Sequence, residues 1–246
     1  MIPLANVLQP LIDAAEAVIL FLHDDVGLEW GWAIVGLTFI TRIAILPLSL
    51  KQIRSMRHLQ AHAPELKALQ ERYKGDKERL QREMMGFYRE NKINPLASCW
   101  PLLLQLPVFL SLFYLLRSES FTDDVVNAPP VGFLFVDNLT EKAGGAELAV
   151  LIVLFIGTQI AAGLVMAARV DRQQRIIMFA LPLVFAPFIA SFPAGLAVYW
   201  ITTNVWTLGQ QWVVHTFWPP PEKPTPEEIE AAKPPPKPPR KKKRRR

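Results

Sequence analysis

The sequence is short of cysteine and of charge. Its single cysteine, Cys99, lies in an apolar stretch, which excludes a disulfide framework and a metal site built from cysteines. Charged residues make up 20% of the 246 residues, and none occurs in 95–116, 148–168 or 176–214. Apolar runs of 18 residues or more are typical of transmembrane helices. The sequence therefore predicts an all-α membrane protein that crosses the bilayer several times.

Five transmembrane helices are predicted. The uncharged run 176–214 is too long for one crossing, because a helix rises about 1.5 Å per residue and the hydrocarbon core is about 30 Å thick. The segment 192–195 (Phe-Pro-Ala-Gly) divides it, since proline cannot donate a helical hydrogen bond and glycine tolerates a turn. The predicted spans are 30–50, 94–116, 148–168, 176–192 and 194–217.

Two segments outside the spans have helical patterns of their own. In residues 1–29, polar residues recur every three or four positions opposite an apolar face, which predicts an amphipathic helix that lies in the external membrane interface. Residues 51–93 hold 11 Lys or Arg and 6 Asp or Glu among heptad-like apolar positions. Gly75 and Asp76 interrupt that pattern, so a cytoplasmic helical hairpin is expected there.

The charges of the loops predict the orientation. Residues 1–29 carry no basic and 5 acidic side chains, whereas loop 117–147 carries 2 and 6, loop 169–175 carries 3 and 1, and the tail 218–246 carries 10 and 4. The positive-inside rule then places the N-terminus and 117–147 outside, and the hairpin, 169–175 and the tail in the cytoplasm. Because the first basic residue is Arg42, we expect no signal or transit peptide, which favours a bacterial plasma membrane.

Arg42 is the one ionised side chain within the predicted spans, roughly 13 Å from the cytoplasmic end of its helix. No Asp or Glu occurs in any span, so an ion pair inside the membrane is excluded. Two alternatives remain: the side chain snorkels to the surface, or it faces a hydrated groove that opens towards the cytoplasm. Thr38 lies one turn away on the same face and favours the groove. Other polar residues in the spans are, taken singly, more typical of helix–helix hydrogen bonds.

The sequence offers little for catalysis. It has no glycine-rich phosphate loop and no nucleophile beside a base, and its one i, i+4 histidine pair, His58 and His62, has no adjacent carboxylate motif. We therefore expect neither an enzyme nor a bound metal or cofactor. A small-molecule transporter remains an alternative, although internal repeats and an intramembrane carboxylate are missing. A membrane assembly scaffold is the other alternative.

The C-terminal tail is proline-rich, with 10 of the 22 prolines, and we expect it to be disordered. It ends in a basic cluster that suits either anionic lipid or ribosomal RNA. The cluster consists of Arg240, Lys241, Lys242, Lys243, Arg244, Arg245 and Arg246.

Several segments resemble the Oxa/Alb/YidC family of membrane protein insertases, in the family's order and over about residues 30–215. The first is 38–42 (Thr-Phe-Ile-Thr-Arg), with Pro47-Leu48 and Lys51-Gln52 after it. The second-span signature includes Asn94-Pro95, Cys99, Pro101, 105–109 (Gln-Leu-Pro-Val-Phe) and 112–114 (Leu-Phe-Tyr). The fourth and fifth spans match through 178–182 (Met-Phe-Ala-Leu-Pro), 192–200 (Phe-Pro-Ala-Gly-Leu-Ala-Val-Tyr-Trp), Asn204 and Gln210-Gln211.

The resemblance implies five helices around a polar groove through which nascent membrane segments pass from the cytoplasm into the bilayer, without nucleotide hydrolysis. It assigns Arg42 and Thr38 to the groove, and Tyr199 and Trp200 to positions that meet the substrate. Gln105, Gln159 and Asn204 join the expected groove as polar residues of the other spans. The implied partners are nascent membrane proteins and the lipid bilayer, with the Sec translocon, the signal recognition machinery and the ribosome as further candidates through the hairpin and tail.

Overall fold

A computed structural model describes residues 3–91, 93, 100–167 and 172–217. These residues form α-helices and one π-helical turn, and they contain no strand beyond two isolated bridges. The predicted all-α class is therefore confirmed for this part of the chain. Among the described residues, the contacts define two compact units, one formed by residues up to 52 together with those of 100–217, and the other by the described residues of 53–93.

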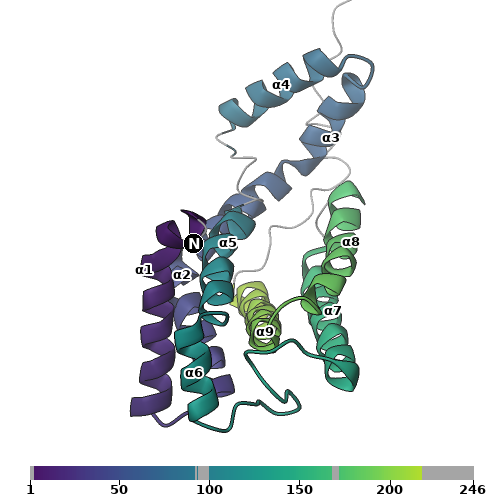
Figure 1. Ribbon diagram of the computed structural model, residues 1–246. Coiled ribbons are helices and arrows are strands. Elements are labelled where there is room, and N and C mark those ends of the chain that lie inside the picture. The colour runs from purple at the N-terminus through teal and green to yellow at the C-terminus, as the bar shows by residue number, and fades with distance from the viewer. Residues whose placement is uncertain (1–2, 92, 94–99, 168–171, 218–246) are drawn as a thin grey trace, which may run out of the picture. The chain divides into compact units, whose positions relative to one another are not determined.

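In the first unit, the N-terminal helix α1 (Pro3–Leu20) packs beside α5 (Trp100–Leu115) (Figure 1). Ile12 and Ile19 on its apolar face are buried, whereas Asp13 on the polar face is exposed. A π-helical turn, η1 (Phe21–Asp25), then leads towards α2 (Trp30–Ala61). Whether α1 lies in a membrane interface stays a prediction.

The other long helices of this unit are α7 (Gly145–Ala167), α8 (Arg172–Ile189) and α9 (Ala194–Phe217), and α7 contacts both α8 and α9. The break between α8 and α9 falls at Pro193, as proline and glycine chemistry predicts. Gly195 permits a close approach there, because a Cβ at this position would lie only 3.0 Å from the carbonyl oxygen of Leu139.

The segment between α5 and α7 is more ordered than a simple loop. It contains the short helix α6 (Glu119–Asn127), which the sequence analysis did not predict. The hydroxyl of Ser118 caps α6 by accepting a hydrogen bond from the backbone N–H of Phe121 at 3.3 Å. Phe121 itself is buried against the ring of Trp30.

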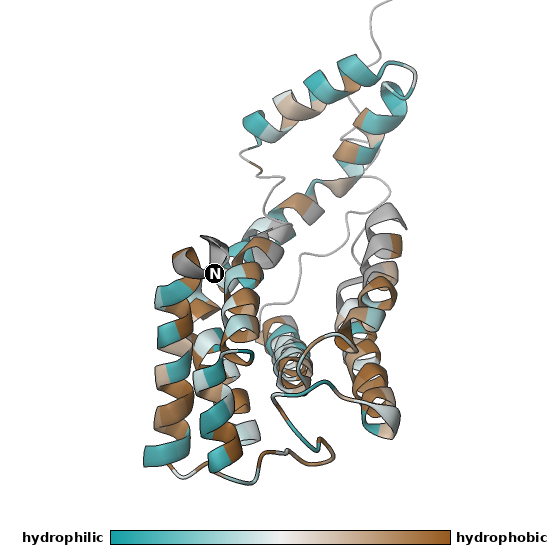
Figure 2. Cartoon of the chain, viewed as in Figure 1, coloured by the Kyte–Doolittle hydropathy of each residue, from teal (hydrophilic) through white to brown (hydrophobic). Residues whose placement is uncertain are grey.

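The second unit contains α3 (Ala63–Arg72) and α4 (Lys77–Glu90), which contact each other. Asp76 caps α4 by accepting a hydrogen bond from the N–H of Arg79 at 3.0 Å, so the chain turns at the predicted break. Figure 2 shows α3 and α4 as largely hydrophilic and α7 as largely hydrophobic.

Two of the described helices are long and apolar enough to cross a membrane, over Trp30–Leu59 and Gly145–Leu164, and each contains an 18-residue stretch with a mean hydropathy of 2.0. A shorter apolar helix covers Leu103–Leu115. The count of five spans and the side of the membrane assigned to each loop stay predictions. The helix α2 continues to Ala61, well past the predicted end of its span at residue 50. The charged residues from Lys51 onwards favour water over lipid, but they do not end a helix.

Candidate functional site

Arg42 lies in the middle of α2 and reaches α5. Its Nη2 donates a hydrogen bond to Oε1 of Gln105 at 2.6 Å. Among the residues that the structure describes, the ion pairs join Arg79 to Glu83 and Arg82 to Glu78, and none includes Arg42. A guanidinium carries five N–H donors and keeps its charge in proteins. Arg42 is therefore a cation held by a neutral amide.

Gln105 extends this contact to a third helix. Its Nε2 donates a hydrogen bond to the hydroxyl of Tyr199 in α9 at 2.5 Å. Tyr199 is 2% exposed. One amide thus uses its acceptor on Arg42 and its donor on Tyr199, and it links α2, α5 and α9 by hydrogen bonds. We call these three side chains the arginine chain.

Thr38 lies next to this chain on α2 and is completely buried. Its hydroxyl donates to the carbonyl oxygen of Ile34 in its own helix at 2.8 Å. Its proton is therefore already engaged, and the hydroxyl oxygen can only accept a further hydrogen bond.

An apolar cavity of about 140 Å³ adjoins Tyr199 and is lined by α1, α2 and α5. Its polar walls have partners within the protein: the Thr41 hydroxyl donates to the carbonyl of Thr38, and the Ser111 hydroxyl donates to the carbonyl of Pro107. The arginine chain is therefore polar at Arg42 and Gln105, and at Tyr199 it adjoins a space lined mainly by apolar side chains.

Asn204 is not part of the arginine chain. It is buried on α9, and its Nδ2 donates to the hydroxyl of Thr158 in α7 at 3.1 Å. The Thr158 hydroxyl in turn donates to the carbonyl oxygen of Leu154 at 2.7 Å. This neutral pair, which we call the α7–α9 pair, thus ends on the backbone of α7. Gln159 follows Thr158 on α7, and its Oε1 is buried with no hydrogen-bond partner in the described part of the chain.

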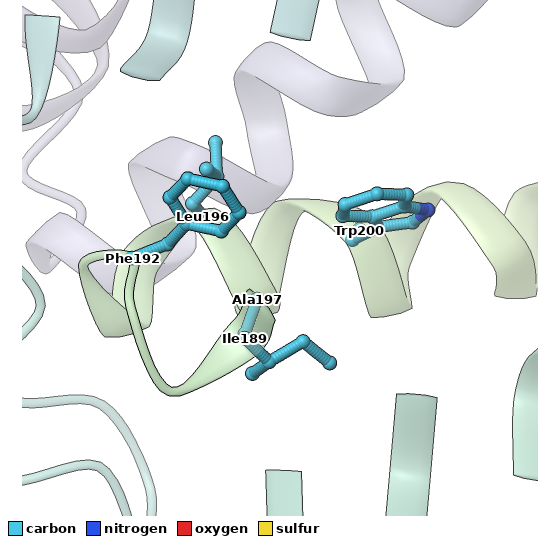
Figure 3. A pocket seen from close by; sticks show the side chains of 5 residues that line it. All are labelled: Ile189, Phe192, Leu196, Ala197 and Trp200. Atoms are coloured by element: carbon cyan, nitrogen blue, oxygen red, sulfur yellow. The ribbon is translucent and has the colours of Figure 1, made fainter. Parts of the chain in front are cut away.

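Trp200 follows Tyr199 but belongs to an aromatic cluster. Its ring lies 5.1 Å from the ring of Phe109 in α5, 5.1 Å from that of Phe155 in α7 and 6.0 Å from that of Phe185 in α8. It also lines a small pocket at the turn from α8 into α9 (Figure 3). This half-buried side chain therefore packs three helices against α9.

The structure thus joins three of the predicted site residues, Arg42, Gln105 and Tyr199, by hydrogen bonds, and it does not join Asn204, Gln159 or Trp200 to them. The sequence analysis did not anticipate the contacts of Phe109 and Ser111 around these residues. The basic cluster 240–246, and the motif residues Asn94, Pro95 and Cys99, lie outside the described residues.

Comparison with known proteins now decides the family. A family model described as "60Kd inner membrane protein" matches residues 21–220, which is most of the chain. A protein of Streptomyces avermitilis named "Membrane protein insertase YidC" is 38% identical, over 77% of this chain and 52% of the relative. The chain belongs to the YidC family.

Other YidC comparisons agree. A YidC insertase of Neisseria meningitidis serogroup C is 36% identical, over 79% of this chain and 34% of the relative. A solved structure titled "Active YidC insertase crystal structure with the first transmembrane domain resolved" has a TM-score of 0.63 and 26% identity, covering 87% of this chain and 46% of that chain. The chain thus spans between about a third and about half of the length of these YidC relatives.

Proposed function

We propose that this chain is a bacterial inner-membrane insertase that moves nascent membrane segments from the cytoplasm into the bilayer without hydrolysing a nucleotide. Membership of the YidC family supports this proposal, since the curated relatives are named membrane protein insertases. The proposed role needs no bond to be formed or broken in the substrate, so the protein is not an enzyme in this account.

The arginine chain is the observation that carries the mechanism. Arg42 has no acidic partner among the described residues, and its hydrogen-bond partner Gln105 is a neutral amide. Opposite charges attract more strongly in a partly desolvated site than in water. The proposed groove therefore attracts the carboxylates of a substrate's polar tail to Arg42, while Gln105 holds the guanidinium in place.

The proposed substrate path follows from the surroundings of the arginine chain. The polar tail pauses beside Arg42, whose remaining N–H groups replace hydrogen bonds to water, while the buried Thr38 packs beside the guanidinium on α2. The apolar segment then moves along Tyr199 and Trp200 into lipid. Partition into the bilayer drives the movement together with the membrane potential, which contributes about 2.3 kcal/mol per charge per 100 mV. Gln159 and Asn204 support the helices beside this path in the proposal.

The topology is part of the same proposal. Five spans surround the groove, the N-terminal segment 1–29 and the loop 117–147 lie outside, and the hairpin 51–93 and the C-terminal tail lie in the cytoplasm. The hairpin and the tail are the surfaces for cytoplasmic partners, with the Sec translocon, the signal recognition machinery and the ribosome as candidates. The partner that the arginine chain itself serves is the nascent membrane segment.

The direct test uses liposomes that contain the full chain and a single-span substrate with an acidic N-terminal tail. We expect wild type and Arg42→Lys to insert the substrate, and Arg42→Ala to lose at least about tenfold in rate, because about 1.4 kcal/mol of stabilisation corresponds to a factor of ten. Protection of the translocated tail from added protease measures insertion.

Arg82→Ala is the matched control. Arg82 is also a helical arginine, but it is exposed and paired with Glu78 at 2.7 Å, so its loss should leave insertion unchanged. Equal insertion by wild type, Arg42→Ala and Arg42→Lys would overturn the role of the cation. Insertion no better than that of empty liposomes would overturn the insertase proposal and favour an assembly scaffold.

A further inference from the structure

The segment between α6 and α7 is fastened to the start of α9 by backbone hydrogen bonds. The N–H of Ala194 donates to the carbonyl oxygen of Glu141 at 2.7 Å, and the N–H of Gly195 donates to that of Leu139 at 2.8 Å. The N–H of Leu139 in turn donates to the carbonyl oxygen of Val131 at 3.0 Å, and the Leu139 side chain is 1% exposed. The base of this segment is therefore a fixed part of the fold.

The same segment packs on the first turn of α2. The Phe133 ring lies directly against Gly31, where an added Cβ would come within 2.1 Å of it. The ring also makes an edge-on contact with Trp32, with centroids 5.1 Å apart. Only glycine at position 31 permits this approach. Phe133 is thereby buried beside an exposed tryptophan at the end of a candidate transmembrane helix.

Residues 133–136 close a tight turn. Phe133 and Val136 exchange two backbone hydrogen bonds of 2.8 Å, which leaves Leu134 and Phe135 at the tip. Leu134 has φ +56°, and it is the one non-glycine residue with positive φ among those described. Leucine is a costly choice for this conformation, which usually favours Gly or Asn. The tip residues are nevertheless apolar and exposed, Leu134 by 78% and Phe135 by 41%.

From this turn we propose a lipid-binding site: the tip Leu134–Phe135 inserts into the bilayer interface on the side where α2 begins. This inference rests on the membrane location in the proposed function. Trp32, beside the buried Phe133, is 48% exposed, and tryptophan is typical of membrane–water interfaces. Two side chains are far too small an area for a stable protein interface, whereas interfacial anchoring requires only a few apolar side chains.

The inference gives the segment a mechanical role. Its tip contacts lipid, and its base holds the first turn of α9, the helix that carries Tyr199 and Trp200. The tip therefore fixes the depth of α9 in the bilayer.

The test places one fluorescent label at a time on single cysteines in the full chain, after Cys99→Ser removes the native cysteine. Leu134→Cys reports on the tip, Asp137→Cys reports on an exposed polar site three residues away, and Val153→Cys reports on the apolar face of α7, where Val153 is 68% exposed. A lipid with a nitroxide near the headgroup is the quencher. Because interfacial apolar groups lie about 5–10 Å below the surface, we expect at least about twofold stronger quenching at position 134 than at 137.

A second variant separates lipid contact from any effect of the label or of misfolding. In this variant the label is at Phe135→Cys, and Leu134→Asn replaces the apolar side chain by asparagine, which tolerates positive φ. We expect quenching at position 135 to fall towards the value for position 137.

The outcomes also separate this inference from the proposed function. Quenching at 153 together with equal, weak quenching at 134, 135 and 137 would overturn the tip site and leave the membrane location intact. A blue-shifted but unquenched label at 134 would indicate a protein contact and would also overturn it. No quenching at 153 by nitroxides at any depth would contradict the membrane location, and the tip site with it.

Discussion

Two side-chain hydrogen bonds described above join α9 to neighbouring helices, and they differ in kind. At Tyr199, α9 joins the arginine chain, in which one amide links it to a half-buried guanidinium. At Asn204 it forms the α7–α9 pair, in which a neutral amide and a hydroxyl satisfy each other and the backbone. Polar groups within apolar helices are therefore not equivalent: the first contact leaves charged N–H donors to spare, and the second contains no charged group. We assign substrate binding to the arginine chain and helix packing to the α7–α9 pair.

The largest effect on stability is expected from the aromatic cluster that lies between these two contacts. Trp200→Ala removes ring contacts with Phe109, Phe155 and Phe185 at once. Large aromatic truncations in cores cost about 3–5 kcal/mol. We expect a clear fall in the thermal unfolding midpoint in detergent, with Trp200→Phe falling much less. An unchanged midpoint for Trp200→Ala would show that the cluster does not support α9.

Replacing Gln105 tests the arginine chain itself. Gln105→Leu leaves Arg42 and Tyr199 without the partners described here, at a cost of about 1.5–3 kcal/mol for a hydrogen bond to a charged group. Gln105→Glu retains an acceptor but gives Arg42 an internal carboxylate. We expect both variants to insert an acidic-tailed substrate more slowly, and Gln105→Glu to unfold at a temperature no lower than wild type. Normal insertion by Gln105→Glu would mean that Arg42 does not need to be free of an acid.

Tyr199→Phe is a smaller change within the arginine chain. It removes one hydroxyl, which accepts from Gln105, and retains the ring beside the cavity. A neutral hydrogen bond contributes about 1 kcal/mol, so we expect insertion to slow by about fivefold at most. A loss of insertion rate as large as that of Arg42→Ala would instead indicate that the Tyr199 hydroxyl itself takes part in substrate binding.

The smallest effect is expected at the α7–α9 pair. Thr158→Val removes the hydroxyl that Asn204 contacts, and interhelical hydrogen bonds in membranes average about 0.6 kcal/mol. The unfolding midpoint should fall slightly, while insertion per folded molecule should match wild type. A selective loss of insertion in a normally stable Thr158→Val protein would contradict the division between the two contacts.

Local chemistry made much of the fold predictable. The break at Pro193 and the cap at Asp76 follow from residues that cannot continue a helix or that favour its start. The helix α9, Ala194–Phe217, has the limits expected from the uncharged run and this break. By contrast, the continuation of α2 to Ala61 was not predicted, because the change in charge at Lys51 marks a change of solvent and carries no helix-stop signal.

The site was predictable as a set of residue types but not as a set of contacts. The charge of Arg42 in an apolar helix identifies it without a structure. The bond between Gln105 and Tyr199 joins residues 94 positions apart, and no periodicity encodes such a pairing. Asn204 shows the converse, since a buried polar residue on the right helix proved to pair with Thr158. Only the packing of the helices distinguishes these cases.

The central claim is that Arg42 attracts carboxylates of the substrate, and a matched series of substrates tests it most directly. Single-span substrates that differ only in their tails, with zero, one or two acidic residues, are inserted by wild type and by Arg42→Ala. Because a charge pair is worth about 1 kcal/mol at contact when exposed and up to about 4 kcal/mol when half-buried, wild type should insert the acidic tails at least about tenfold faster than Arg42→Ala does. The two proteins should insert the neutral tail at similar rates. An equal ratio of wild-type to Arg42→Ala rates for all three tails would contradict the claim.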